Sequence, residues 1–331
     1  MKNDIVIFFL VLFSVIFVLG CDWKGKQTKD GEIEPQDFGN ARTGVSFRER
    51  FPDANGVYGT NFGITEELNN QQGRNEAYIS VQHLSGTYID VVIDTPATSY
   101  YDKFYMEIPR QITSDDRVRI ENLNVPDNLN SSVATRTFFI GLANSFGTPY
   151  RFSVKGYTED DSIGSLKEVN YGYVVIYPSK TMKVHLVKDF NDNSYFDSAK
   201  EKISSAFKQS VETVTFSQQT ISSGNHSLGN SRYVDSLKQI IRNNVSSADY
   251  YVVLLNTATN STNVTISSPF IFIPFNTNSK DKAEIGRLAA HELAKRKGLS
   301  ASNTVSSNNL MRPAGTGINL NFSQWQGLRG Y

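Results

Sequence analysis

The period of hydrophobic residues changes near residue 172, and this change constrains the fold more than any other feature of the chain. Between residues 56 and 160, short stretches alternate apolar with polar residues and are separated by Gly, Pro, Asn and Asp. They are rich in β-branched and aromatic side chains, which is typical of an antiparallel β-sandwich. The stretches that carry this prediction are 78–81, 87–93, 103–108, 117–120, 137–142 and 150–154.

After residue 172, strand-like stretches alternate with helix-like ones, which predicts an α/β layer. Apolar residues recur at helical spacing in three segments, and continuous apolar runs between them predict buried strands. The sequence therefore predicts an α+β protein, with an antiparallel β-sandwich domain over 56–170 and an α/β domain over 171–331. The expected helices are 194–207, 233–241 and 281–297, and the expected strands are 184–187, 211–216, 250–255 and 270–275.

Three local features add expectations for the second domain. Ser194 followed by Asp197 is similar to a capping box, with Asp in place of Glu. Pro269 and Pro274 flank the predicted strand 270–275, which favours a position at the edge of a sheet. Residues 189–193 resemble the start of a calcium loop, but the glycine at its sixth position is missing. We therefore favour a turn that leads into the helix.

The N-terminal residues predict an export signal. An apolar run from Ile5 to Gly20 is too short for a membrane span and has the length of a signal-peptide core. It ends in Val18-Leu19-Gly20-Cys21, which resembles the lipobox of bacterial lipoproteins. The resemblance implies a signal peptide over 1–20, cleavage before Cys21 and a diacylglycerol on its thiol. An ordinary signal peptide and an uncleaved anchor helix are the alternatives.

A lipid on Cys21 would attach the protein to a membrane of the cell envelope. Residues 21–55 are polar and are expected to form the lipidated cysteine and a flexible tether. The membrane could be the outer membrane at the cell surface, or the inner membrane at its periplasmic face. Cys21 is the only cysteine, so the fold has no disulfide and depends on its core. The formal net charge is zero, which argues against a nucleic-acid partner.

The stretch from His291 to Pro313 contains the candidate catalytic and metal-binding residues of the sequence. Zinc peptidases with the motif H-E-x-x-H bind the metal through two histidines one helical turn apart, and the glutamate activates the bound water. The metzincins extend this motif to H-E-x-x-H-x-x-G-x-x-H and add a Met-turn. The segment resembles that pattern. The resemblance assigns His291 as first ligand, Glu292 as general base, Gly298 as the helix end and Met311 as the Met-turn residue. The strand and helix order over 180–331 resembles a metzincin domain too.

The same segment departs from the pattern at both remaining zinc ligands. Lys295 stands at the second histidine and Ala301 at the third. Alanine has no donor atom, a lysine ammonium has no lone pair, and a catalytic zinc needs about three protein ligands. We therefore expect no cofactor, with His291 and Glu292 as vestiges of the site. The other histidines, at positions 83, 185 and 226, lack helical spacing to His291.

A plainer interpretation of this stretch is an amphipathic helix that ends at Gly298, with Glu292 paired to Arg296. A further hypothesis is that the Lys295 ammonium meets the Glu292 carboxylate where zinc once bound. Three functions follow from these observations. The first is an inactive peptidase-like module that binds a protein or peptide, with 270–275 as the pairing edge. The alternatives are an active zinc-dependent metalloendopeptidase with a non-standard ligand set, and a structural envelope lipoprotein.

Overall fold

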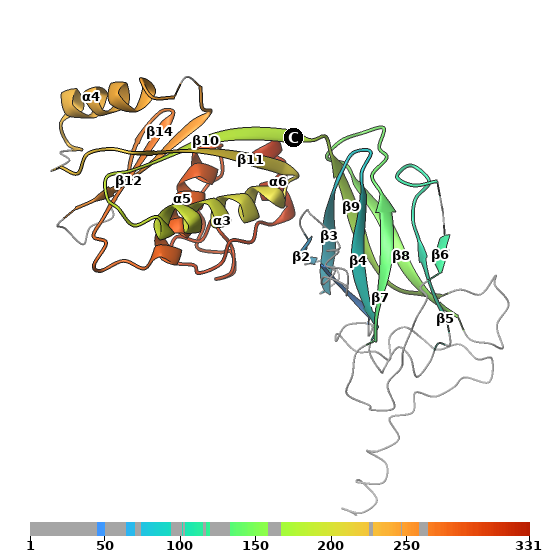
Figure 1. Ribbon diagram of the computed structural model, residues 1–331. Coiled ribbons are helices and arrows are strands. Elements are labelled where there is room, and N and C mark those ends of the chain that lie inside the picture. Colours follow the sequence, from blue (N-terminus) through green and yellow to red (C-terminus); the bar gives the residue numbers. More distant parts are fainter. Residues whose placement is uncertain are drawn as a thin grey trace, which may run out of the picture.

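The structure is a computed structural model that describes residues 45–49, 64–69, 74–93, 101, 103–114, 117–119, 133–157, 167–224, 228–245, 247–257 and 264–331. The described chain combines helices with mixed sheets, so the protein is of the α+β type. Figure 1 shows an all-strand part beside a second part in which helices cover a sheet. Residues 1–44, which include the lipobox and Cys21, lie outside the described residues, as does His226.

The first part contains two sheets that share one core. Apolar side chains from both sheets form a single buried cluster, among them Val91 and Ile93 from the smaller sheet and Ile79 and Val81 from the larger. The smaller sheet has the order β1 (Val45–Glu49), β4 (Gly86–Ile93), β7 (Val133–Ile140). The larger has the order β2 (Ile64–Asn69), β3 (Arg74–Gln82), β9 (Lys167–Tyr177), β8 (Pro149–Tyr157), β5 (Lys103–Glu107), β6 (Arg117–Arg119).

The first part differs from the sequence-based expectation in three ways. Strand β1 lies inside the segment 21–55 that was expected to be a tether, and it pairs with β4. Strands β3 and β9 pair in parallel, so the larger sheet is mixed and not purely antiparallel. Strand β9 crosses the expected boundary at 170/171. Its end lacks alternation because both of its faces are covered: Val174 joins the core of the first part and Val175 joins that of the second.

The second part is a five-stranded sheet with helices on both faces. Its order is β11 (Glu212–Thr220), β10 (Lys180–Lys188), β12 (Tyr250–Asn256), β14 (Phe270–Phe275), β13 (Thr265–Ser267). All of these pairings are parallel except the one between β13 and β14. Helices α3 (Ser194–Lys208), α5 (Lys282–Arg296) and α6 (Phe322–Arg329) share one core with the sheet, and α4 (Ser231–Arg242) covers its other face (Figure 1).

The prediction that residues 270–275 form a sheet edge is wrong. Strand β14 lies between β12 and β13, and the three-residue β13 is the edge strand. Because β13 pairs only with Phe270, Ile271 and Phe272, Pro274 lies beyond its reach. The missing N–H of this proline therefore costs no bond to β13. Pro274 therefore lies at a position of β14 that no described residue of β13 pairs with, although β14 itself is not an edge strand.

The expected capping box of α3 is absent as well. The N-cap is Asn193, one residue before Ser194, and no side chain caps the helix. The Asn193 side chain instead accepts a bond from Lys188 Nζ at 2.5 Å. Asp192 accepts from the Ser194 N–H at 2.8 Å, and Asp197 lies 3.8 Å from Lys200. The bonds of Asn193 and Asp192 hold residues 189–193 as a turn that leads into α3.

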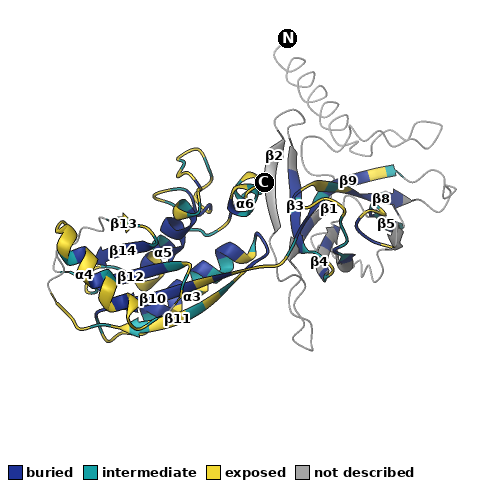
Figure 2. Ribbon diagram, turned by 90° about the horizontal axis from the view of Figure 1, so that it is seen from above, coloured by how far each residue is buried: buried dark blue, intermediate teal, exposed yellow. Residues whose placement is uncertain are grey.

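Helix α6 lies between the two parts of the molecule (Figure 2). Phe322 stacks on Tyr78 of β3 with 4.6 Å between ring centroids. Gln326 donates to the Gly147 carbonyl at 2.5 Å, and Arg329 donates to the Pro178 carbonyl at 2.6 Å. Tyr177 at the end of β9 belongs to the same buried cluster as the helix. The two parts are therefore joined by a shared core as well as by the short step from β9 to β10.

Candidate functional site

Helix α5 carries the residues that the sequence singled out. Asp281 begins it as N-cap, where its carboxylate accepts the Ala283 N–H at 3.2 Å. Gly298 ends it with a φ of +105°. There the Gly298 N–H bonds to the Lys295 carbonyl at 2.9 Å and the Leu299 N–H to the Ala294 carbonyl at 3.1 Å. These two bonds are those of a Schellman motif, which requires the left-handed residue that glycine supplies.

Lys297 fixes the end of this helix to the sheet. Its ammonium lies 2.5 Å from both carboxylate oxygens of Glu212, the first residue of β11. Both side chains are buried, and the Lys297 ammonium also lies 5.2 Å from the centroid of the Phe207 ring. Burial lowers the pKa of Lys297, and the Glu212 carboxylate opposes this effect. The position of the helix end is thus set by an ion pair in the interior.

His291 is buried and its ring is fixed by one backbone acceptor. Its Nδ1 lies 2.8 Å from the carbonyl oxygen of Leu310. Because a carbonyl only accepts, Nδ1 carries the proton and Nε2 keeps its lone pair in the neutral ring. Burial lowers the pKa of His291 more than its hydrogen bond to Leu310 raises it. The approach of Nε2 to Glu292 Oε1, at 3.9 Å, is therefore not an ion pair at neutral pH.

The carboxylate of Glu292 is paired with Lys295. The ammonium of Lys295 donates to Oε1 at 3.0 Å and to Oε2 at 2.9 Å. The glutamate side chain is 7% exposed and the lysine side chain 36% exposed. The cation thus lies toward solvent and covers a buried anion. The structure favours this pairing over the plainer alternative with Arg296.

Met311 lies in a turn that passes beneath α5. Its side chain is fully buried, and its N–H bonds to the side chain of Asn309 at 2.8 Å. The carbonyl of Met311 accepts the N–H of Ser302 at 2.9 Å, which brings the loop after Gly298 back to the turn. Ala301 precedes Ser302 in that loop and is exposed. The structure therefore brings together the segments of His291, Ala301 and Met311.

These residues do not provide a zinc site of the usual kind. His291 Nε2 is one suitable donor, but Lys295 binds both oxygens of Glu292 and Ala301 contributes no donor. Within the described ranges, no group of three His, Cys, Asp or Glu side chains could hold a metal ion. A catalytic zinc requires about three protein ligands, so the donor set does not fit.

The other described histidines do not complete the site. His185 lies on β10 beside Tyr251, on the sheet face that α4 covers, whereas α5 packs on the opposite face. Its ring nitrogens contact Ser217 Oγ at 2.7 Å and Gln219 Oε1 at 3.2 Å. His83 belongs to the first part, where its ring packs against Phe146.

Sequence reasoning missed Arg287, one turn before His291 on α5. This guanidinium is buried and donates to the backbone carbonyls of the turn that contains Met311. Burial lowers its pKa. An arginine on the otherwise apolar inner face of a helix was the available signal, since long charged side chains are rarely buried without a partner. Its acceptors are Asn309, Leu310, Arg312 and Gly317.

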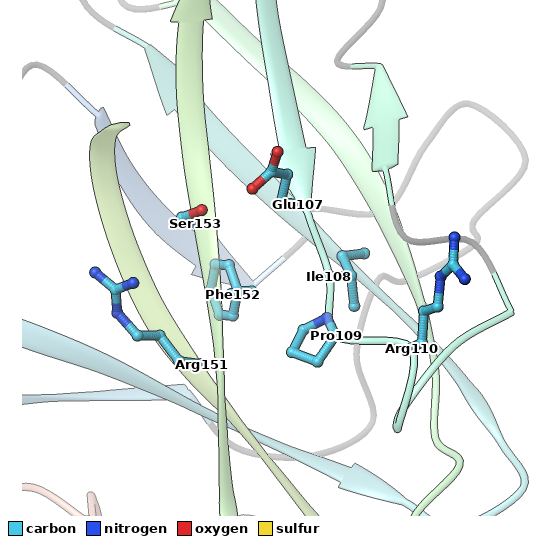
Figure 3. Close-up of a pocket in the computed structure, with 7 residues that line it drawn as sticks. All are labelled: Glu107, Ile108, Pro109, Arg110, Arg151, Phe152 and Ser153. Carbon is cyan, nitrogen blue, oxygen red and sulfur yellow. The ribbon is translucent and has the colours of Figure 1, made fainter. Parts of the chain in front are cut away.

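A hollow of about 770 Å³ lies elsewhere, between β5 and β8 of the first part (Figure 3). Arg110 and Arg151 lie on opposite sides of it. Arg151 is already bound to Glu168 at 2.6 Å, and Glu107 is bound to Lys155 at 2.7 Å. Charges that are satisfied within the protein give no indication of a ligand, so the hollow does not compete with the site on α5.

Comparisons with known proteins do not assign a family. No protein family and no curated protein matches the chain. A solved chaperone–substrate complex is similar at 12% identity and a TM-score of 0.29, over 54% of this chain and 30% of that one. A Bacteroides ovatus GH5 xyloglucanase in complex with a XXXG heptasaccharide is similar at 7% identity and a TM-score of 0.19, over 81% and 63%. The chain spans less than two thirds of either protein. Similarity this weak does not support a conclusion about fold or function.

Proposed function

We propose that residues 171–331 form a metzincin-like domain that has lost its zinc site and binds a protein or peptide. The observation that carries this proposal is the pairing of Lys295 with both oxygens of Glu292. Lys295 stands where the second zinc ligand of the motif would stand, and it neutralises the general base of that motif. The buried turn with Met311 and the helix end at Gly298 support the same ancestry.

Binding is favoured over hydrolysis because the catalytic groups of the motif are missing or occupied, whereas the backbone that could bind a peptide is present. A general base must accept a proton from water, and both oxygens of Glu292 already accept from an ammonium. A binding surface needs only shape and free backbone groups, which survive the loss of a metal. The surface that suits an extended peptide is the edge strand β13, in place of the β14 edge expected from the sequence.

Strand β13 offers this edge in an accessible form. Within the described residues it pairs with β14 alone, so no described strand pairs with its other side. Ile266 in its centre is 42% exposed, and it is one of few large apolar side chains among the described residues that are exposed. A peptide that adds a strand here would gain backbone bonds to β13 and apolar contact with Ile266.

The test is a random peptide library displayed on phage and selected against the full chain in the presence of EDTA. Selected peptides are then titrated against the wild type, Ile266→Lys and Ile240→Lys. Ile240 on α4 is 51% exposed and provides the same substitution away from the edge. We expect Ile266→Lys to weaken binding at least about tenfold, or about 1.4 kcal/mol, and Ile240→Lys to leave it unchanged. Equal effects, or no selected peptide, would contradict the proposal.

An active metallopeptidase would give different results. Stoichiometric zinc in the reloaded wild type, with peptide cleavage lost in Glu292→Ala, would replace the binding function with the enzymatic one. The complementary experiment restores both ligands through Lys295→His together with Ala301→His. If the scaffold is that of a metzincin, zinc affinity should appear in this double variant and not in either single one.

We further propose that the protein is a lipoprotein anchored to a membrane of the cell envelope through Cys21. The support is the sequence Val18-Leu19-Gly20-Cys21 after an apolar run of signal-peptide length. Among the described residues, no helix has the length and apolar character to cross a bilayer. Cys21→Ser should abolish labelling by a fatty acid analogue and move the protein out of the membrane fraction of the producing bacterium.

A further inference from the structure

Arg287 is a buried cation whose hydrogen bonds all go to backbone oxygens of one turn. Its Nε donates to the Gly317 carbonyl at 2.9 Å. Its Nη2 lies 3.4 Å, 3.0 Å and 2.6 Å from the carbonyl oxygens of Asn309, Leu310 and Arg312. A guanidinium is planar and presents its donors in a fixed fork, so several carbonyls that meet it are held in one arrangement.

One of these carbonyls also determines the state of His291. The Leu310 oxygen accepts from Arg287 Nη2 at 3.0 Å and from His291 Nδ1 at 2.8 Å. A carbonyl oxygen has two lone pairs, so both bonds can form together. Arg287 and His291 are one turn apart on α5 and therefore lie on the same side of the helix. Both side chains are buried.

We propose that Arg287 is a positioning residue of the α5 site. By holding the carbonyl of Leu310, it keeps His291 in the tautomer with the proton on Nδ1. Nε2 is then an acceptor with a fixed direction beside the pair formed by Glu292 and Lys295. The inference goes beyond the proposed function and does not depend on peptide binding at β13. The tautomer itself is a property of the free protein.

Orientation of a histidine by a bond to its second nitrogen is a general device in sites that use the first nitrogen. Here the backbone turn supplies that bond, and a turn by itself is a mobile acceptor. The turn has other supports that do not involve His291. Asn309 and Gln324 exchange two side-chain bonds at 2.9 Å and 3.2 Å, and Arg312 donates to the Val305 carbonyl at 2.8 Å. Arg312 therefore provides a matched control for a purely structural role.

The experiment measures the tautomer of His291 in the full chain labelled with nitrogen-15 histidine. Correlation spectra through two-bond couplings distinguish protonation on Nδ1 from protonation on Nε2, and His291→Gln identifies the signal. The wild type should show the Nδ1–H form. Arg287→Met should convert His291 to a mixture of tautomers or to the Nε2–H form. Arg312→Met removes a bond from the same turn and should leave the Nδ1–H form intact.

Retention of the wild-type signal in Arg287→Met would overturn the inference, as would an equal change in both variants. If Arg287→Met does not fold, Arg287→Lys and Arg312→Lys replace the pair, since an ammonium cannot reproduce the planar fork. The same criteria then apply to the new pair. Failure here leaves peptide binding at β13 untouched, and loss of peptide binding leaves the tautomer result standing. The two proposals therefore fail separately.

Discussion

Lys295 Nζ lies 2.9 Å from one carboxylate oxygen of Glu292 and 3.0 Å from the other, so a single ammonium satisfies both oxygens of a buried anion. The two residues are three positions apart on α5, which places them on neighbouring points of the helix surface. The arrangement makes Lys295 a structural partner of Glu292, whatever its evolutionary origin. Replacement of Lys295 should therefore lower the free energy of unfolding, whether or not the protein has an activity.

Lys295→Met should lower the free energy of unfolding by about 1–3 kcal/mol, because it leaves a buried carboxylate without its partner. Adding Glu292→Gln should recover part of the loss, since the unpaired charge is then removed. The measurement is urea unfolding at constant pH. Lys280→Met is the control, because Lys280 pairs at 2.7 Å with Glu284, whose side chain is 55% exposed. That variant should change stability by less than about 1 kcal/mol.

Gly298→Ala should destabilise the protein by about 1 kcal/mol or more, although a methyl group would meet no atom there. The cost arises from the backbone, because a φ of +105° is strained for any residue with a Cβ. Gly229 offers equally open space, and it is not among the residues with positive φ. Gly229→Ala should therefore be neutral or slightly stabilising. Similar losses in the two variants would show that the Schellman geometry does not govern the end of α5.

The contact between Tyr78 and Phe322 should couple the two parts energetically. The rings stack at 4.6 Å with 10° between their planes, which favours a coupling energy of about 0.5–1.5 kcal/mol. A double-mutant cycle with Tyr78→Ala and Phe322→Ala measures this quantity through urea unfolding. Purely additive effects would indicate that helix α6 packs on the first part without a specific contact at this point.

Burial lowers the pKa of His185 below its ordinary value of 6.5. The unfolded chain binds a proton near that value, whereas the folded protein does so only at lower pH. Stability from this group is therefore fully present above about pH 6.5 and is lost as the pH falls toward the folded pKa. Urea unfolding across this range should show a smaller acid loss for His185→Gln than for the wild type. Part of the loss should remain, because burial also lowers the pKa of His291.

Helix α5 illustrates what the sequence could predict. Its observed range, Lys282–Arg296, follows closely from the apolar spacing and from Gly298, since both signals are local. The position of β14 inside the sheet was not predictable, because no local signal states which strands pair with it. Arg287 was missed for a similar reason. Its position on the apolar face of α5 indicates a buried cation, but its acceptors are backbone carbonyls, which residue types do not identify.

Strand β9 shows a second limit of sequence patterns. Alternation indicates a strand with one covered face, but Val174 and Val175 of β9 are both buried, one in each core. The pattern of a doubly covered strand is a plain apolar run, which resembles the interior of a helix over short lengths. The expected boundary at 170/171 therefore falls inside a strand that contributes to both cores.

The position of α6 has a consequence for the order in which the molecule assembles. This helix, from the last residues of the chain, rests on Tyr78 of β3, which belongs to the part that leaves the ribosome first. Contacts between such distant segments close large loops and slow the folding reaction. Until α6 has been synthesised, the face of β3 that carries Tyr78 lacks this contact. During that interval a chaperone would have most to protect at the face that α6 finally occupies.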